Sequence, residues 1–519
     1  MKMLFKLASS QLILFFLTPT FVFSNKPISN DSIINIGSRL ELFVDDYLIN
    51  SIKGNARLQL NQPEIKEIVL TFDEPWEGNC GAYRSVFFDG IRYRMYYNTY
   101  DQRTQVSDTL TRWYTCYAES HDGINWYKPN LGLYEFQGSK NNNIVFINGV
   151  MGDIDADGVH CAVFKDENPN VPPEALYKAV MNYKGKPRGL IVYKSPDGIN
   201  WQPMTDHAVI TDGAFDSQNL AFWDNDKGEY RAYWRYFTDG TDNSPYKGIR
   251  GIRTARSNDL ISWYDQEDLT YVNSSSEVQL YTNQIKPYFR APHIFIGFPT
   301  RYIDRGWSES MKALPEFEDR EWRSSLDNRY GTAITEGLFM TSRDGVLFNR
   351  WNEAFLRPGI ERPGTWNYGN IYLSWSIIET KSSLKGAPNE LSFYAGENFR
   401  STTDNVAVRR YTLRKDGFVS VNAPTSGGEL VTKLLTFTGN KLILNFSTSA
   451  AGDIKVEIQD ENGSPIPGYK VEDCDPIFGD SIERVVKWKN APPLSSLDGK
   501  AIRLRFVLKD ADLYSIRFK

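Results

Sequence analysis

The stretch Glu119–Trp126, "ESHDGINW", decides the fold because the chain repeats it. Lys194–Trp201 reads "KSPDGINW", and weaker copies begin at Arg256 ("RSNDLISW"), Thr341 ("TSRDGVLF") and Leu413 ("LRKDGFVS"). Successive copies are 75, 62, 85 and 72 residues apart. These steps exceed the ~40–45 residues of a short propeller repeat but suit four-stranded blades with long loops, so the period predicts a β-propeller.

Each copy is typical of a hairpin turn. Asp122 followed by Gly123 supplies the positive φ that a tight turn needs, and Trp126 can pack over that turn. An acid, a histidine and a tryptophan in one short stretch would also suit a site, but a catalytic group is not needed at the same point of every repeat. We therefore predict that Asp122, Gly123 and Trp126 are structural residues of a hairpin between outer strands.

The intervals before the copies contain the same succession of strands. In the first interval these are "YRSVFFDG", "RYRMYYNTY" and "YTCYAESHDG"; in the third they are "SQNLAFWD", "EYRAYWRYF" and "IRGIRTARSND". Apolar and polar residues alternate, and Gly, Asp and Asn bound the runs, which are strand and hairpin signals. Five such units predict an all-β, five-bladed β-propeller over residues 25–422. Leu40–Ile49 is expected to pair with the last blade and close the ring, with Asp45 and Asp46 anchoring a loop.

The end of the chain is predicted to be a separate unit. The run "APTSGGE" at Ala423–Glu429 indicates a linker. After it, "LLTFTGNKLILNFST", "GDIKVEIQDENGSPIPGY" and "AIRLRFVLKDADLYSIRFK" alternate as strands do, and "DENG" marks a hairpin. Residues 423–519 therefore predict a β-sandwich, without a catalytic-looking cluster of its own.

The first 24 residues are typical of a signal peptide. Met1–Lys6 is basic, Leu7–Phe23 is mostly apolar, and "VFS" precedes Asn25 at the expected cleavage point. The apolar run is short and contains a proline, which favours a cleaved signal over a membrane anchor. We expect a secreted or periplasmic protein that is not inserted in the membrane once residues 1–24 are removed.

The charge balance and the cysteine spacing limit the kinds of partner and cofactor that we expect. Without Lys2 and Lys6 the 59 basic side chains become 57, against 64 acidic ones, so the mature chain is mildly acidic and nucleic acid is not an expected partner. The four cysteines, Cys80, Cys116, Cys161 and Cys474, are widely spaced, so we expect no metal site and no cofactor. A Cys80–Cys116 disulfide and buried free thiols both remain open, as does the oligomeric state.

The combination of "S-x-D-G-x-x-W" hairpins in a propeller with a following β-sandwich resembles glycoside hydrolase family 32 and the related families 43, 68 and 130. The resemblance covers nearly the whole mature chain at the level of architecture. The hairpin motif itself has low specificity, because a similar turn occurs in sialidases. The resemblance implies a carbohydrate substrate and a funnel in which acids at the starts of the innermost strands do the chemistry.

Carried over residue by residue, the resemblance implies that Asp216 in "GAFDSQN" stands where the acid/base of the third blade would lie; strand capping is the alternative. The nucleophile motif of the first blade is missing, and Glu77 in "PWEGNC" is the nearest acid. In the second blade "DIDADGVHCAVF" replaces the usual motif, so Asp157 is a further catalytic candidate and His160 a ligand-contacting one. Glu336 in "AITEGLF" is another catalytic candidate, from the fourth blade.

Further residues are expected to bind substrate. Arg84 and Gln218 lie at strand starts of the first and third blades. Arg290 and His293 in "YFRAPHIF" would face one rim of the fourth, for anion or hydroxyl recognition, although a salt bridge and a packed histidine fit as well. Trp366 is a candidate platform for the apolar face of a sugar; among 13 tryptophans, core packing is the common role.

These features predict a glycoside hydrolase that acts on oligosaccharides or polysaccharide fragments through two carboxylates in the funnel. A glycoside phosphorylase is an alternative if Arg290, His293 and Arg301 form a phosphate cradle. A non-catalytic carbohydrate-binding propeller is a second alternative, since the family 32 signatures are missing. A sialidase would need three arginines together in the funnel.

Overall fold

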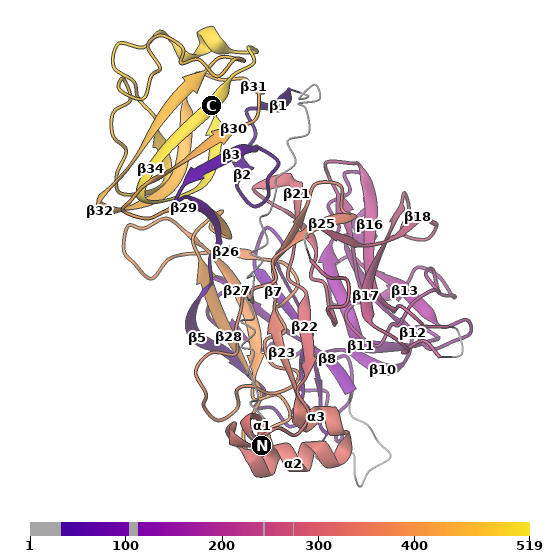
Figure 1. The fold of residues 1–519 in the computed structure, drawn as a ribbon. Coiled ribbons are helices and arrows are strands. Elements are labelled where there is room, and N and C mark those ends of the chain that lie inside the picture. Colours follow the sequence, from indigo (N-terminus) through magenta and orange to yellow (C-terminus); the bar gives the residue numbers. More distant parts are fainter. Residues whose placement is uncertain (1–32, 103–112, 242–243, 273) are drawn as a thin grey trace, which may run out of the picture.

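The computed structural model describes residues 33–102, 113–241, 244–272 and 274–519. The predicted signal peptide, residues 1–24, lies outside them. The expected all-β fold, a propeller followed by a sandwich, is confirmed, with a small helical insertion (Figure 1). Within the described ranges, no helix combines the length and apolar character needed to cross a membrane.

The first two antiparallel units of the propeller share one nine-stranded sheet. The first unit contains β6 (Arg84–Phe88), β7 (Tyr93–Tyr100), β8 (Trp113–Ser120) and β9 (Trp126–Tyr127). The second contains β11 (Ile154–Lys165), β12 (Tyr177–Tyr183), β13 (Gly189–Ser195) and β14 (Gln202–Pro203), with a 3-10 turn at Pro173–Ala175. The strand β10 (Ile144–Met151) pairs with both β8 and β11 and so joins the two units.

The remaining units are separate sheets. The third contains β15 (Leu220–Asp224), β16 (Glu229–Phe237), β17 (Arg250–Ser257) and β18 (Trp263–Asp268). The fourth contains β19 (Thr270–Val272), β20 (Lys286–Tyr288), β21 (Ala291–Gly297), β24 (Met340–Ser342) and β25 (Leu347–Arg350). The last contains β26 (Ile378–Thr380), β27 (Glu390–Glu397), β28 (Ala407–Leu413) and, from far earlier in the chain, β5 (Glu64–Thr71).

A segment expected to be a long loop in the fourth unit is partly helical. It contains β22 (Thr300–Asp304), α1 (Glu309–Ala313), α2 (Phe317–Leu326), α3 (Asn328–Thr332) and β23 (Ala333–Gly337). The side chain of Ser308 caps α1 by accepting a hydrogen bond from Met311 N. The helices lie at the end of the molecule opposite the C-terminal sandwich (Figure 1).

Four of the five repeated turns are hairpins between outer strands, as predicted. The fifth, which begins at Leu413, is not, because the strand that follows it, Val419–Ala423, pairs with strands outside the propeller and not with β28. Ser120 and Trp126 face each other across β8 and β9, and Gly123 has a φ of 72°. One carboxylate oxygen of Asp122 accepts hydrogen bonds from the two amides that follow Gly123, each at 2.8 Å, and Trp126 Nε1 donates to Gly123 O at 3.1 Å. The copies at Lys194–Trp201 and at Arg256–Trp263 repeat these bonds.

These turns also fasten neighbouring units to one another. The hydroxyl of Tyr96 on β7 donates to Gly198 O in the second unit at 2.8 Å, and Tyr233 on β16 donates to Gly345 O in the fourth at 2.9 Å. Tyr394 on β27 donates in the same way to Gly123 O, which ties the last unit to the first. The repeat is therefore a contact between units as well as a turn.

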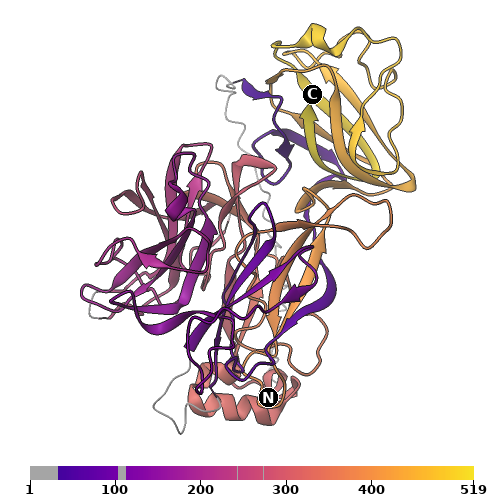
Figure 2. The same cartoon turned by 180° about the vertical axis from the view of Figure 1, so that it is seen from behind.

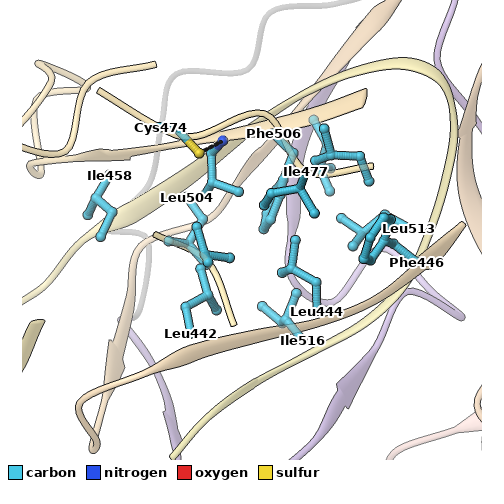
Figure 3. Packing of buried hydrophobic residues seen from close by; sticks show 14 of the residues in the cluster. Leu442, Leu444, Phe446, Ile458, Cys474, Ile477, Leu504, Phe506, Leu513 and Ile516 are labelled. Carbon is cyan, nitrogen blue, oxygen red and sulfur yellow. Dashed lines mark hydrogen bonds between the residues drawn. The ribbon is translucent and has the colours of Figure 1, made fainter. Parts of the chain in front are cut away.

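The C-terminal sandwich is built on two long strands, β32 (Leu442–Gln459) and β34 (Arg503–Phe518). They pack apolar side chains into one core, which Figure 3 shows around Leu444, Phe446 and Phe506. The other strands are β29 (Val419–Ala423), β30 (Gly428–Thr432), β31 (Leu435–Phe437) and β33 (Asp480–Val485), with a 3-10 turn at Leu494–Leu497. Because β29 and β30 both pair with β34, the expected linker is a turn between two strands of this sheet.

The N-terminal strands join the sandwich before the propeller begins. They are β1 (Ile34–Gly37), β2 (Glu41–Leu42), β3 (Ile49–Gly54) and β4 (Arg57–Leu60), which pair with β31, β34, β30 and β29 respectively. The prediction that Leu40–Ile49 closes the propeller is therefore wrong. The strand that closes it is β5, which lies beside β28 (Figure 2).

The side chains of this segment explain the difference. An oxygen of Asp45 accepts a hydrogen bond from Tyr47 N, which turns the chain away from an extended strand. Phe43 packs into the sandwich core, whereas Val44 packs against the propeller. Asp45 also pairs with Arg343 at 2.9 Å, which is the loop-anchoring role expected for it. The segment therefore joins the two units instead of completing a blade.

Candidate active site

A cavity of about 280 Å³ lies where the first strands of the propeller units begin. Tyr83 precedes β6, Asp216 precedes β15, Tyr281 precedes β20 and Tyr372 precedes β26, while His160 lies in the middle of β11. Each unit thus contributes to one pocket, which is the arrangement expected of a propeller funnel. The volume is near the lower limit of the ~300–1,000 Å³ of small-molecule sites, so it suits one sugar ring.

Aromatic rings form much of the pocket wall. Tyr83 lies 5.5 Å from the ring of His160 and 6.0 Å from that of Tyr372, between ring centres. Tyr372 in turn lies 5.5 Å from Tyr281, and Trp113 lies 6.2 Å from His160. Such rings offer flat apolar surfaces with polar edges, which suits the alternating faces of a sugar.

Asp216 is the more open carboxylate of the pocket, with 45% of its side chain exposed. It forms an ion pair with Arg235 on β16, whose side chain is only 3% exposed. The guanidinium carbon of Arg235 also lies 5.0 Å from the ring centre of Tyr281. Arg235 therefore holds the carboxylate of Asp216 from behind and leaves its other side open to a ligand.

Asp157 and His160 form a second polar group in the same pocket. Asp157 Oδ2 lies 2.5 Å from His160 Nδ1, and Asp157 Oδ1 accepts a hydrogen bond from Val159 N. Burial alone would raise the pKa of Asp157, but the adjacent His160 and the amide of Val159 lower it below its ordinary value. Asp157 thus orients the imidazole of His160 through its Nδ1 atom.

Tyr281 lies among several cations. Burial alone would raise its pKa, but Arg235, a hydrogen bond from Tyr368 (3.0 Å between hydroxyls), Arg329 and Arg250 lower it to about 8. A phenol that ionises so readily reports a strongly positive electrostatic environment. Of these three arginines, Arg329 lines the cavity, whereas Arg235 and Arg250 do not, so they are not the cluster of three that a sialidase would need in the funnel.

Glu77, a predicted catalytic acid, lies outside this pocket. It is buried, accepts a hydrogen bond from the hydroxyl of Tyr97, and pairs with Lys128 at 2.6 Å. Burial raises the pKa of Glu77, although Lys128 and Tyr97 lower it in part. Its partners hold it in the loop that precedes the first unit.

The residues expected from the fourth unit also lie elsewhere. Glu336 pairs with Arg301 at 2.5 Å across β22 and β23, outside the pocket lining. Arg290 pairs with Asp416 at 2.8 Å, and His293 Nε2 lies 3.2 Å from Glu41. Because Arg290, His293 and Arg301 each have a different carboxylate partner, they do not form the phosphate cradle that a phosphorylase was expected to need.

Three further candidates for substrate binding do not line the pocket. Arg84 is fully buried and donates to Gly81 O (2.7 Å) and Ala82 O (3.3 Å), so it fixes the backbone that precedes β6. Gln218 is buried between units, where it donates to Ser85 Oγ and accepts from Gln284 Nε2. Trp366 donates to Gly359 O and does not line the cavity.

Sequence reasoning missed part of the pocket. Tyr83 and Tyr372 sit at strand starts that had been identified as funnel positions, so the rule was sufficient but was applied only to acids and bases. Arg329 is on α3, in the segment expected to be a loop, and Arg400 follows β27 in a connecting loop. No local pattern marks Arg400, because only the tertiary fold brings it to the pocket.

Metal binding finds no support in the described part of the chain, where no three His, Cys, Asp or Glu side chains are grouped to hold an ion. All four cysteines are buried free thiols, so Cys80 and Cys116 do not form a disulfide.

A second, more apolar cavity of about 390 Å³ lies at the opposite ends of the first strands. Its acids Glu167 and Glu379 each have a lysine neighbour, at 3.9 and 2.6 Å.

Comparisons with known proteins give structural matches alone. No family model and no curated protein match the chain. Three of the solved structures that match are glycoside-active proteins by their descriptions. The first has the description "The GH130 family of mannoside phosphorylases contains glycoside hydrolases that target beta-1,2 mannosidic linkages in Candida mannan"; it is 13% identical, the match covers 68% of this chain and 94% of that chain, and the TM-score is 0.38. Another is the catalytic domain of the Coprinopsis cinerea GH62 α-L-arabinofuranosidase (8%, 68% and 97%, 0.40), and the third is the Bombyx mori GH32 β-fructofuranosidase (9%, 90% and 95%, 0.37). At these identities and scores the likeness carries no argument about what this chain binds or cleaves.

Proposed function

We propose that the protein is a glycoside hydrolase that removes single sugar units from oligosaccharides. The observation that carries the proposal is the meeting of Asp216 with the Asp157–His160 pair in one small pocket walled by aromatic rings. Cleavage of a glycosidic bond needs two acid/base or nucleophilic groups, one on each side of the bond. A pocket that only bound sugar would need no such groups.

The two polar groups differ in how they are held. Asp216 takes the acid/base position that the family resemblance implies, with Arg235 behind it. Asp157, whose pKa is lowered, stays ionised beside His160 Nδ1, so the pair provides the second group. Hydrolysis gives one proton to the departing oxygen and takes one from water, and the two groups together regain their starting protonation.

The test is turnover of oligosaccharides by the mature protein and by Asp216→Asn, with Asp206→Asn as a matched control. Asp206 is an exposed aspartate outside the pocket. We expect Asp216→Asn to lower kcat by about 10²–10⁴-fold and Asp206→Asn to leave it unchanged. The panel includes neutral and acidic oligosaccharides, with and without inorganic phosphate.

Three outcomes would contradict the proposal. Undiminished turnover by Asp216→Asn would remove the assigned residue. Binding of oligosaccharides without turnover by the unchanged protein would favour the sugar-binding alternative. Turnover that requires phosphate would favour a phosphorylase.

Secretion or a periplasmic location stays a prediction from residues 1–24, checked by N-terminal sequencing of the exported protein.

A further inference from the structure

The pocket lining contains two acids and two arginines, and one of the arginines has no acidic partner among the described residues. Asp157 and Asp216 are its acids, and each already has a partner, His160 and Arg235. Arg329 and Arg400 also line the cavity. Arg329 pairs with Asp327 at 2.9 Å, so its charge is balanced at the edge of the pocket. The charge of Arg400 is the one left over.

Arg400 is buried and has no acidic partner in the part of the chain that the structure describes. It is 4% exposed, and its Nη2 donates a hydrogen bond to the hydroxyl of Tyr100 at 3.2 Å. Among the residues that the structure describes, no carboxylate pairs with Arg400, and its Nε and Nη1 find no acceptor. A buried guanidinium with two unused donors is costly, which indicates that a ligand completes the site.

The surroundings of Arg400 hold its guanidinium in one orientation. Its central carbon lies 3.4 Å from the ring centre of Tyr330 and 5.1 Å from that of Tyr368. Both tyrosines line the cavity beside Arg329. Stacking keeps a guanidinium planar and fixed, so that its free N–H groups can meet two oxygens of one ligand group.

Other arginines of the described chain differ from Arg400 in one respect or another. Arg343, whose side chain is 18% exposed, meets Glu41 and Asp45, and the buried Arg323 meets Asp319 at 2.8 Å. Arg350 is 3% exposed and its Nε and Nη1 also find no acceptor, but it does not line the cavity. Arg84 also lacks an acid, but it donates to two backbone carbonyls and does not line the cavity. Arg400 therefore differs from these arginines because it combines unused donors, no acidic partner among the described residues and a place in the cavity wall.

We propose that Arg400, assisted by Arg329, binds an oxyanion of the substrate, and that the substrate is an acidic sugar whose carboxylate supplies it. A carboxylate offers two oxygens in the spacing that a guanidinium fork accepts. Inorganic phosphate has the same chemistry and is the other source. This inference rests on the proposed function, because it names the sugar that Asp216 and the Asp157–His160 pair would act on.

Binding can be measured without turnover. Calorimetric titrations compare glucuronate and galacturonate with glucose and galactose, and inorganic phosphate is titrated separately. Unchanged protein is compared with Arg400→Lys, which keeps the charge but loses the fork, and with Arg329→Gln. Arg256→Gln, an arginine outside the pocket, is the matched control.

We expect a uronate to bind at least about tenfold more tightly than its neutral counterpart, as one charge-assisted contact allows. Arg400→Lys should remove most of that preference and leave affinity for neutral sugars unchanged, whereas a purely structural role would weaken both alike. Equal affinity for acidic and neutral sugars, in every variant, would overturn the inference. If phosphate bound tightly in a way that depends on Arg400 and no uronate bound, the oxyanion would be phosphate and the proposal of an acidic sugar would be wrong.

A second readout covers the case in which Arg400→Lys does not fold. The ionisation of Tyr281, whose pKa Arg329 helps to lower, can be followed by ultraviolet absorbance in the unchanged protein. A bound uronate should suppress tyrosinate at pH 8, because its negative charge opposes that of the phenolate. No change at saturating uronate would count against the inference.

The two proposals fail separately. Uronate binding that depends on Arg400, without turnover of any acidic oligosaccharide, would keep the anion site and remove the hydrolase. Turnover of neutral oligosaccharides that depends on Asp216, without uronate binding, would keep the hydrolase and remove the anion site.

Discussion

The two ends of each propeller unit follow opposite rules. At the outer hairpins the chain uses the same residue types and the same hydrogen bonds, as the copies around Asp122 and Asp197 show. At the strand starts the units differ, with Tyr83, His160, Asp216, Tyr281 and Tyr372 in corresponding places. Repetition therefore marks what holds the fold together, and variation marks where the pocket is.

The same substitution made at both ends tests this division most strongly. Asp157→Ala should lower kcat by about 10²–10⁴-fold, which is roughly 3–5 kcal/mol of barrier. Because it leaves the amide of Val159 and Nδ1 of His160 without their partner, it should also lower the free energy of unfolding by about 1–3 kcal/mol. Asp197→Ala removes the acceptor of two turn amides, each bound at 2.8 Å, and should lower the free energy of unfolding by about 2 kcal/mol with kcat unchanged. Steady-state kinetics and urea unfolding measure the two effects.

If Asp197→Ala lowered kcat as much as Asp157→Ala, the separation of roles would fail. An undiminished kcat in Asp157→Ala would have the same meaning. The control Asp206→Ala, at an exposed aspartate, should change neither quantity.

The fastening role of the turns is tested at Gly345. This residue has a φ of 79°, and a Cβ there would lie 1.8 Å from Arg231 Nη1 and 2.7 Å from the hydroxyl of Tyr233. Gly345→Ala should lower the free energy of unfolding by about 2–3 kcal/mol, because backbone strain adds to the displaced contact between units. Gly228→Ala is the control, since Gly228 has a similar φ of 69° and open space around it. Equal losses of unfolding free energy in the two variants would mean that backbone strain alone, and not the displaced contact between units, lowers stability.

Much of this division could be predicted from the sequence. The repeat located the hairpins, and the strand-start rule located Asp157, His160 and Asp216, which line one pocket. The same rule placed Arg290 and His293 incorrectly, because the first strand of the fourth unit is β20 and Arg290 lies in the turn after it. One strand of error moved both residues to the far end of the unit.

Other parts depend on contacts that no local pattern contains. Arg400 and Arg329 come to the pocket from a loop and from a helical insertion, so only the tertiary arrangement joins them. The closing strand was misassigned for a similar reason. Leu40–Ile49 has strand-like residues, but Phe43 and Val44 face different cores, whereas Glu64–Thr71 pairs along β28.

The smallest expected effect is the pH dependence of Tyr281. With a folded pKa of about 8 against an ordinary 10, its phenolate contributes stability that is lost as the pH falls through 8. The pKa values of Tyr83, Tyr368 and Tyr372 are raised, so these tyrosines stay neutral in that range. Ultraviolet titration should show one group near pH 8 that Tyr281→Phe removes. Its persistence in Tyr281→Phe would mean that another group responds.

The path of the N-terminal segment has a consequence for the order of synthesis. The residues Ile34–Leu60 are made first, yet their partner strands β29, β30, β31 and β34 are made last. The strand β5 likewise waits for β28. A growing chain must therefore keep these edges unpaired, and exposed edges invite aggregation. The propeller is complete only when β28 has been made, and the sandwich only when β34 has been made, so a cut after residue 422 would keep the propeller strands but leave β1, β2 and β3 without their partners.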